Sequence, residues 1–109
     1  MQILKTDAAF EALLQTERLL LVQFGAATCA PCKAIGQKLD AWLGEHPSVT
    51  AVYIPIEEFK ALTGQLGIFT VPTIFIYAEG KLTVRASGYF SLEDVLRQLE
   101  RYETLLFEV

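Results

Sequence analysis

The spacing of apolar residues predicts alternating helices and strands along the first half of the chain. After Thr6 and Asp7, either of which can cap a helix start, apolar residues recur at helical spacing over residues 10–14. Residues 19–24 form a short apolar run, which is typical of a strand buried on both faces. Residues 51–56 are rich in Val, Tyr and Ile and predict a second strand.

A longer helix is predicted between these strands, beginning around Cys29 and Cys32. We expect this helix to end at Gly44, which is followed by Pro47. Because Trp42 lies on the apolar stripe of this helix, we expect it in the core rather than in a site. The stripe consists of Ile35, Leu39, Trp42 and Leu43.

The second half of the chain predicts a short helix, a hairpin and a last helix. Phe59, Leu62 and Leu66 mark one side of the short helix. Residues 73–77 are apolar nearly throughout, whereas residues 81–87 alternate, with Leu82, Val84 and Ala86 inward, and so predict an edge strand. Ser91 caps the last helix, with Asp94 three places on as a short-armed capping box.

Together these elements predict one α/β domain over residues 1–109, with a central mixed sheet of four to five strands flanked by four helices. The crossover helices imply parallel strand pairing in the first half of the chain. The tight hairpin turn forces antiparallel pairing in the second half. A short strand near Ile3 would be the fifth.

Composition and charge narrow the class of protein. Of 109 residues, 52% are hydrophobic, which is ample for a packed core. The net charge of −4 argues against nucleic-acid binding, which needs a basic face. No apolar run approaches the ~20 residues that span a bilayer, and we read no signal peptide. We therefore expect a cytoplasmic protein without a nucleic-acid or membrane partner.

Cys29 and Cys32 stand where a buried strand passes into a helix, and we expect the chemistry there. A bond between them would close a tiny loop and add little stability, which favours a chemical role. The helix start and Lys33 would stabilise a thiolate at Cys29, the predicted nucleophile. Cys32, one turn further on, is predicted to resolve the mixed disulfide. Pro31 is tolerated because an N–H there has no acceptor to lose.

Other interpretations of the cysteine pair stay open at this point. The pair could be half of a zinc site, two inert core cysteines, or a motif that holds a cluster between two chains. A structural zinc site takes four ligands, and the only further candidate is His46, which we expect to be exposed in a loop. We expect no metal and no cofactor besides the redox-active Cys29–Cys32 disulfide.

Residues 24–33 resemble the active-site segment of the thioredoxin family, whose usual core is Trp-Cys-Gly-Pro-Cys-Lys, with Ala30 here between the cysteines. Residues 71–73 and 79–81 and Gly88 match further family positions, so the likeness covers essentially the whole chain. It implies a thioredoxin-like fold, a cis proline facing the cysteines and a groove in which the backbone of Val71 pairs with a substrate strand. The implied groove residues are Thr28, Ala30, Val71, Pro72 and Gly88.

Departures from the family pattern alter what is expected of the site. Gln23 stands where the family carries a buried Asp that helps to deprotonate the resolving cysteine, and an amide cannot take a proton. Gly25 and Thr28 replace two tryptophans, which leaves a smaller and less apolar rim. Tyr53 replaces a lysine near the acid, and Ala30 replaces a glycine. We therefore expect an altered redox potential and substrate range.

The resemblance implies a thiol–disulfide oxidoreductase that acts on protein or small-molecule disulfides. Electrons would come from a reductase or a low-molecular-weight thiol, and we expect a monomer, with a weak dimer as the alternative. A second interpretation is a non-catalytic or redox-switched adaptor that kept the fold while exchange activity faded. Loss of the buried acid and both tryptophans is consistent with that alternative.

Three groups of residues outside the cysteine motif have an ordinary and a functional interpretation. We expect the aromatic residues Phe69, Tyr89 and Phe90 to pack, with substrate contact as the alternative. Glu57 and Glu58 indicate a solvated turn, although a carboxylate there could substitute for the missing acid. We expect the apolar C-terminal residues to dock on the domain, with a dimer contact as the alternative. These are Leu105, Leu106, Phe107 and Val109.

Overall fold

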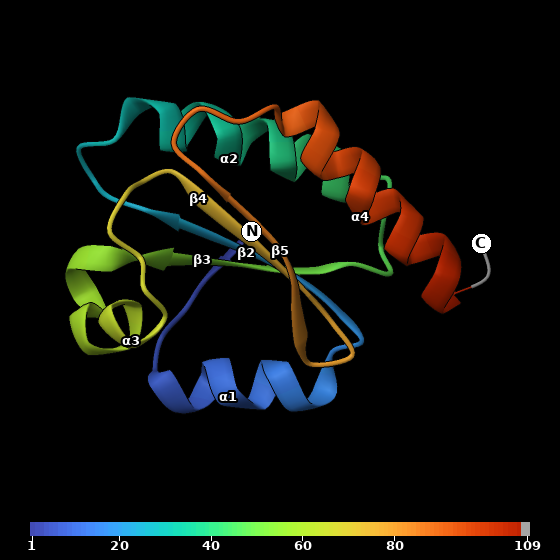
Figure 1. Ribbon diagram of the computed structural model, residues 1–109, viewed down its shortest axis with the longest axis horizontal. Coiled ribbons are helices and arrows are strands. Elements are labelled where there is room, and N and C mark those ends of the chain that lie inside the picture. The colour runs from blue at the N-terminus through green and yellow to red at the C-terminus, as the bar shows by residue number, and fades with distance from the viewer. Residues whose placement is uncertain (108–109) are drawn as a thin grey trace.

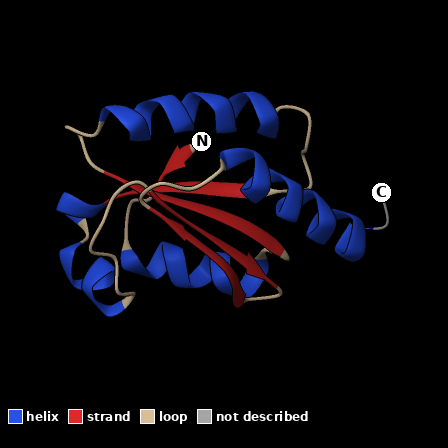
Figure 2. Cartoon of the chain, turned by 45° about the horizontal axis from the view of Figure 1, so that its top comes forward, coloured by secondary structure: helices blue, strands red, loops and turns tan. Residues whose placement is uncertain are grey.

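Helices cover both faces of one five-stranded mixed sheet (Figures 1 and 2). The computed structural model describes residues 1–107. Its elements are β1 (Gln2–Ile3), α1 (Asp7–Thr16), β2 (Leu19–Gly25), α2 (Ala30–Leu43), β3 (Thr50–Pro55), a 3₁₀ turn (Ile56–Glu58), α3 (Lys60–Gln65), β4 (Thr73–Ala78), β5 (Lys81–Ser87) and α4 (Leu92–Phe107). The strand order is β1-β3-β2-β4-β5, with α2 and α4 on one face and α1 and α3 on the other (Figure 1). The predicted fold class is confirmed.

β2 is the central strand, and all seven of its residues are buried. It pairs in parallel with β3 and antiparallel with β4, and β1 adds to β3 in parallel. Leu20, Val22 and Phe24 pack into the core beneath α1 and α3, whereas Leu19 and Leu21 pack beneath α2 and α4. Successive side chains of a strand point to opposite faces, so β2 contributes to both cores. The predicted two-sided burial and both kinds of strand pairing are confirmed.

Two of the predicted helix caps are present. The Thr6 hydroxyl accepts a hydrogen bond from the Ala9 N–H at 3.0 Å, and the Ser91 hydroxyl accepts one from the Asp94 N–H at 3.2 Å. Each bond satisfies one of the N–H groups that have no partner in the first turn of a helix. The helices therefore begin where the sequence predicts.

The alternation expected along β5 is wrong at Leu82. A register shift places Val84 opposite Ile76 but Leu82 opposite Tyr77. Because adjacent residues of a strand point to opposite faces, this bulge turns Leu82 away from the face that Val84 covers. Leu82 is 40% exposed and Val84 only 9%.

The expectation of an exposed His46 is also wrong. Its ring stacks on Trp42 with centroids 3.7 Å apart, and its Nδ1 lies 2.8 Å from a carboxylate oxygen of Glu103. The His46 and Glu103 side chains are 21% and 9% exposed. Glu103 belongs to the buried side of α4, where it ties the helix to the loop after α2. Trp42 packs against the core beneath α2 and α4, as expected.

The end of α4 docks on the domain through two of its apolar residues. Leu106 and Phe107 pack against the core beneath α2 and α4, and the Arg18 guanidinium lies 5.3 Å from the Phe107 ring centroid. Leu105, in contrast, is 73% exposed. Val109, which shared the docking expectation, lies outside the described residues. None of the helices within residues 1–107 is both long and apolar enough to cross a membrane.

We expect Glu103→Ala to lower the free energy of unfolding by about 2 kcal/mol, because it leaves a half-buried imidazole without its hydrogen-bond partner. Denaturant titrations of Glu103→Ala, His46→Ala and the double variant measure the loss and the coupling, expected near ~1 kcal/mol. Glu100→Ala, which removes an exposed carboxylate from the same helix, is the matched control and should change stability by under ~0.5 kcal/mol. Strictly additive losses at His46 and Glu103 would contradict the pairing.

Candidate active site

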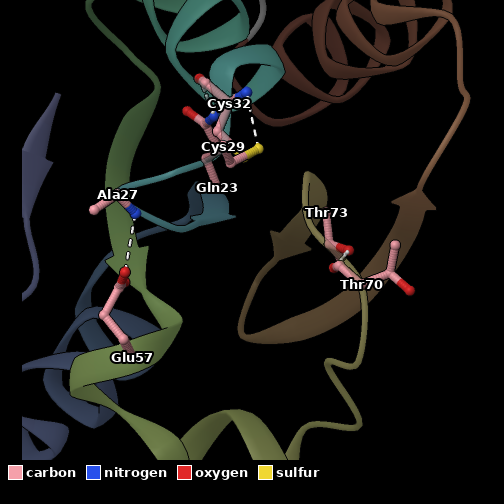
Figure 3. Close-up of a disulfide and its surroundings, with 7 residues drawn as sticks. All are labelled: Gln23, Ala27, Cys29, Cys32, Glu57, Thr70 and Thr73. Atoms are coloured by element: carbon pink, nitrogen blue, oxygen red, sulfur yellow. Dashed lines mark hydrogen bonds between the residues drawn. A yellow bond between two sulfur atoms is a disulfide. The ribbon is translucent and has the colours of Figure 1, made fainter.

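The two cysteines lie at the junction between the end of β2 and the start of α2, and they form a disulfide (Figure 3). Their Cα atoms are 5.3 Å apart. Cys29 is the N-cap of α2, and its Sγ accepts the Cys32 N–H at 3.2 Å. Pro31 occupies the first helical turn, where no N–H acceptor is lost. When reduced, a sulfur at this position faces the positive end of the helix dipole, which favours its thiolate.

The two sulfur-bearing residues differ in exposure. Cys29 is half-buried, whereas Cys32 is only 2% exposed. Lys33 projects into solvent from the next position of the helix. His46, the third ligand that a zinc site would need, lies instead beyond the opposite end of α2 against Trp42 and Glu103.

The loop before β4 lies across a groove from the start of α2. The Val71–Pro72 peptide bond is cis, as the family likeness implies. Gly88, which has a φ of 66°, donates its N–H to the Pro72 carbonyl at 3.2 Å and so fixes the β5–α4 loop beside the proline. Thr73 closes the loop by donating its hydroxyl to the Thr70 carbonyl at 2.6 Å (Figure 3).

A groove of about 630 Å³ runs between these segments. Three of the five expected groove residues, Val71, Pro72 and Gly88, line it together with Pro31. The other two, Thr28 and Ala30, lie exposed on either side of Cys29 and outside the groove lining. The structure therefore brings the proline loop and the Gly88 loop to the helix start, whereas Thr28 and Ala30 are exposed and do not line the groove.

Gln23 is fully buried directly beneath the cysteines. Its side-chain Nε2 donates to the Cys32 carbonyl at 2.8 Å (Figure 3). Its Oε1 has no hydrogen-bond partner among the described residues. A hollow of about 340 Å³ is lined by Gln23, Cys32, Lys33 and Tyr53 together with neighbouring residues. The amide therefore holds the first turn of α2 in place, and its unpaired oxygen can accept a proton donor but cannot be protonated as a carboxylate can.

Glu57 is a site residue whose role the sequence pattern did not identify. Its carboxylate accepts the Ala27 N–H at 2.9 Å and so ties the loop before Cys29 to the end of β3 (Figure 3). This hydrogen bond, and a second one from the Glu57 N–H, lower the pKa of the Glu57 carboxyl. The side chain is exposed, in agreement with a turn. Its position directly after a strand that pairs with β2 is the signal that could have revealed it.

Gly25 and Tyr53, which both depart from the family pattern, lie in contact with each other. A Cβ atom on Gly25 would lie only 2.8 Å from Cε1 of Tyr53, because the Tyr53 ring lies over the glycine. Partial burial, and then the charge of Glu57, raise the pKa of the Tyr53 hydroxyl. The Tyr53 ring from β3 therefore covers the chain at Gly25. Comparing the sequence with the family pattern one residue at a time does not reveal this contact.

The three aromatic residues near the groove behave differently from one another. Phe90 is half-buried and packs against the core beneath α2 and α4, as expected. Phe69 is 87% exposed and Tyr89 is fully exposed, so the packing expectation is wrong for both. Their neighbours explain the outcome, because Ile68 takes the buried position of its loop and Gly88 holds its own loop against Pro72.

The family model for thioredoxin matches residues 1–101 of this chain. A thioredoxin of Alicyclobacillus acidocaldarius subsp. acidocaldarius is 32% identical over 95 residues, which cover 86% of this chain and 90% of that protein. The X-ray structure of Fasciola hepatica thioredoxin has a TM-score of 0.84 at 27% identity, covering 94% of this chain and 99% of that one. A Plasmodium falciparum thioredoxin, with a TM-score of 0.85 at 22% identity and coverages of 94% and 99%, agrees in fold.

These similarities extend over nearly the whole described chain, and the cysteine pair lies at the strand-to-helix junction as a disulfide. On this evidence, the chain belongs to the thioredoxin family, whose members are thiol–disulfide oxidoreductases.

Proposed function

We propose that this protein reduces or exchanges disulfides, with Cys29 as the nucleophile and Cys32 as the resolving cysteine. The difference in exposure between the two cysteines supports this assignment of their roles. Cys29 is half-buried at the helix start and open to a substrate, whereas Cys32 is 2% exposed behind it. A substrate sulfur can therefore reach Cys29 and not Cys32.

Exchange proceeds in two steps that move two electrons to the substrate. The Cys29 thiolate attacks one substrate sulfur, forms a mixed disulfide and expels the other substrate sulfur as a thiolate. The Cys32 thiolate then attacks Sγ of Cys29, which expels the second substrate sulfur and leaves the Cys29–Cys32 disulfide. A reductase or a low-molecular-weight thiol reduces that disulfide for the next cycle. The cysteine pair serves as the redox centre, and the reaction uses no bound cofactor.

The groove provides a backbone site for an extended substrate. Within the described residues, the N–H and C=O of Val71 enter no hydrogen bond of the protein, and Val71 is half-buried at the groove. A substrate strand can pair there with its cysteine toward Cys29, while Pro72 and Gly88 shape the floor and Thr28 and Ala30 form the rim. Lys33 supports the thiolate by its positive charge. Cytoplasmic location and a monomeric state stay predictions from the sequence.

A redox-switched adaptor is the competing function. Gln23 favours it, because a fully buried amide stands where an acid would assist the resolving cysteine. Insulin reduction with dithiothreitol separates the two functions. Catalysis above the uncatalysed rate supports the exchange enzyme, whereas a readily formed disulfide with no catalysis supports the adaptor.

Cys29→Ser should abolish turnover of disulfide substrates, because no sulfur remains where a substrate can reach it. Cys32→Ser should form the mixed disulfide and then stall, since nothing resolves it. Mass spectrometry of each variant after incubation with a disulfide peptide measures the adduct. An adduct on Cys32 in Cys29→Ser, at the rate seen on Cys29 in Cys32→Ser, would reverse the assigned roles.

Gln23→Asp should speed resolution of the mixed disulfide by about a hundredfold, the lower end of what a positioned general base supplies. Stopped-flow reduction of a model disulfide measures the attacking and resolving steps separately. Gln37→Asp is the matched control, because it adds the same charge at an exposed position of α2 that borders the same hollow. Equal resolving rates in wild type and Gln23→Asp would show that the missing acid does not limit this step.

A further inference from the structure

The hollow of about 340 Å³ beside Gln23 lies between the sheet and α2. Its floor is a row across three paired strands, in which Ile3 lies opposite Tyr53 and Tyr53 lies opposite Gln23. Residues that are directly opposite in neighbouring strands point to the same face of the sheet. Three residues of the wall recur at every fourth position of α2 and so share one side of the helix. These are Cys32, Gly36 and Asp40.

The side-chain oxygen of Gln23 is buried at this hollow without a hydrogen-bond partner among the described residues. A Cβ atom on Gly36 would lie 3.5 Å from this Oε1, so the oxygen is directed toward the part of the helix wall that has no side chain. The Nε2 of the same amide is already bound to the Cys32 carbonyl. Leaving a buried acceptor unpaired is costly. The hollow is therefore suited to a molecule with an N–H or O–H group.

None of the titratable side chains that line the hollow, within the part of the chain that the structure describes, is placed to take the proton of Cys32. Resolution requires that proton to leave, because the thiolate is the nucleophile. Lys33 is a cation with no lone pair to offer. Asp40 lies eight residues along α2, about 12 Å away, and its carboxylate holds the Met1 amine at 2.7 Å. Partial burial raises the pKa of the Tyr53 hydroxyl, which stays protonated at neutral pH.

The lining defines the kind of molecule that can take this proton. It must donate one hydrogen bond to Oε1 of Gln23 and accept one from the thiol of Cys32. The Ile3 side chain and the Tyr53 ring favour a neutral molecule over an ion. The volume is ample for a five-membered ring, since one water molecule takes about 30 Å³. A neutral imidazole has one ring nitrogen that donates and one that accepts, and so meets each requirement.

We propose that this hollow binds a small neutral base that carries an N–H, of the imidazole class, and that this base takes the Cys32 proton during resolution. The inference rests on the proposed disulfide exchange and adds a binding site to it. Once the base has accepted the proton, the Cys32 thiolate attacks Sγ of Cys29, and the substrate sulfur leaves as a thiolate. The protonated base returns the proton to solvent. It carries no electrons, so the cysteine pair remains the redox centre.

Single-turnover stopped flow with imidazole tests the proposal, at fixed pH and ionic strength. Release of the second substrate thiol measures resolution. In wild type its rate should rise about a hundredfold with imidazole concentration and then level off, because a bound base acts from a fixed position. N-methylimidazole has no N–H to donate to Gln23, and it should need about fivefold higher concentration for half of its effect, as expected for one lost hydrogen bond. The attacking step should not respond to either base.

Gly36→Ala should remove the levelling, because its Cβ comes into ordinary contact with Oε1 of Gln23 and covers it. Alanine is favoured over glycine within a helix, so this variant should fold. At the imidazole concentration that half-saturates wild type, it should resolve about tenfold more slowly. Gly64→Ala makes the same change in α3, where a Cβ meets open space, and is the matched control. Without imidazole, both variants should resolve at the wild-type rate.

Binding is measured independently of turnover by nuclear magnetic resonance of the oxidised protein. The side-chain amide resonances of Gln23 should shift with imidazole concentration and reach a plateau in wild type and in Gly64→Ala. They should not respond in Gly36→Ala. A Gln23 amide that does not respond in wild type overturns the site.

The outcomes separate this inference from the proposed function. A resolving rate that rises in proportion to imidazole, with the same slope in wild type and Gly36→Ala, shows proton transfer to base in free solution and overturns the site. Disulfide reduction that does not depend on imidazole also overturns it, and leaves the exchange reaction standing. Failure to reduce the disulfide at any imidazole concentration overturns the exchange reaction itself.

Discussion

The central strand β2 is buried on both faces, and its packing positions the elements and loops around it. A strand in the centre of the sheet must be apolar on both sides, so Leu19 to Phe24 admit a single polar side chain, Gln23. β2 ends at Gly25, and a short loop leads from there to the start of α2 at Ala30. The cysteines stand at this turn, where the open N–H groups of a helix face the end of the central strand. The position of the reactive sulfur thus follows from the packing of the sheet.

A few hydrogen bonds then convert this junction into a site. Gln23 holds the Cys32 carbonyl, Glu57 holds the Ala27 N–H, and Gly88 holds the Pro72 carbonyl. The first bond ties β2 to the first turn of α2, and the other two fix loops to segments that are distant in sequence. Together they leave Cys29 accessible and Cys32 covered, which is the asymmetry that two-step thiol exchange needs.

The changes from the family pattern are linked through space. The Tyr53 ring lies over Gly25, and its hydroxyl is close enough to Glu57 for the carboxylate charge to raise its pKa. Glu57 in turn supports the loop before Cys29. Phe69 and Tyr89 are exposed aromatic side chains in the loops that carry Pro72 and Gly88.

Apolar periodicity, capping residues and the Cys-x-x-Cys spacing are local signals, and they suffice to predict the elements, their order, the mixed sheet and the redox pair. The other features depend on contacts between elements, which no local pattern contains. Leu82 stands next to a bulge, and His46 pairs with Glu103, 57 positions away. Phe69 and Tyr89 are exposed because Ile68 and Phe90 take the inner positions. In each case the outcome depends on which residue of another segment arrives opposite, and that pairing is set by packing between elements rather than by the pattern within one.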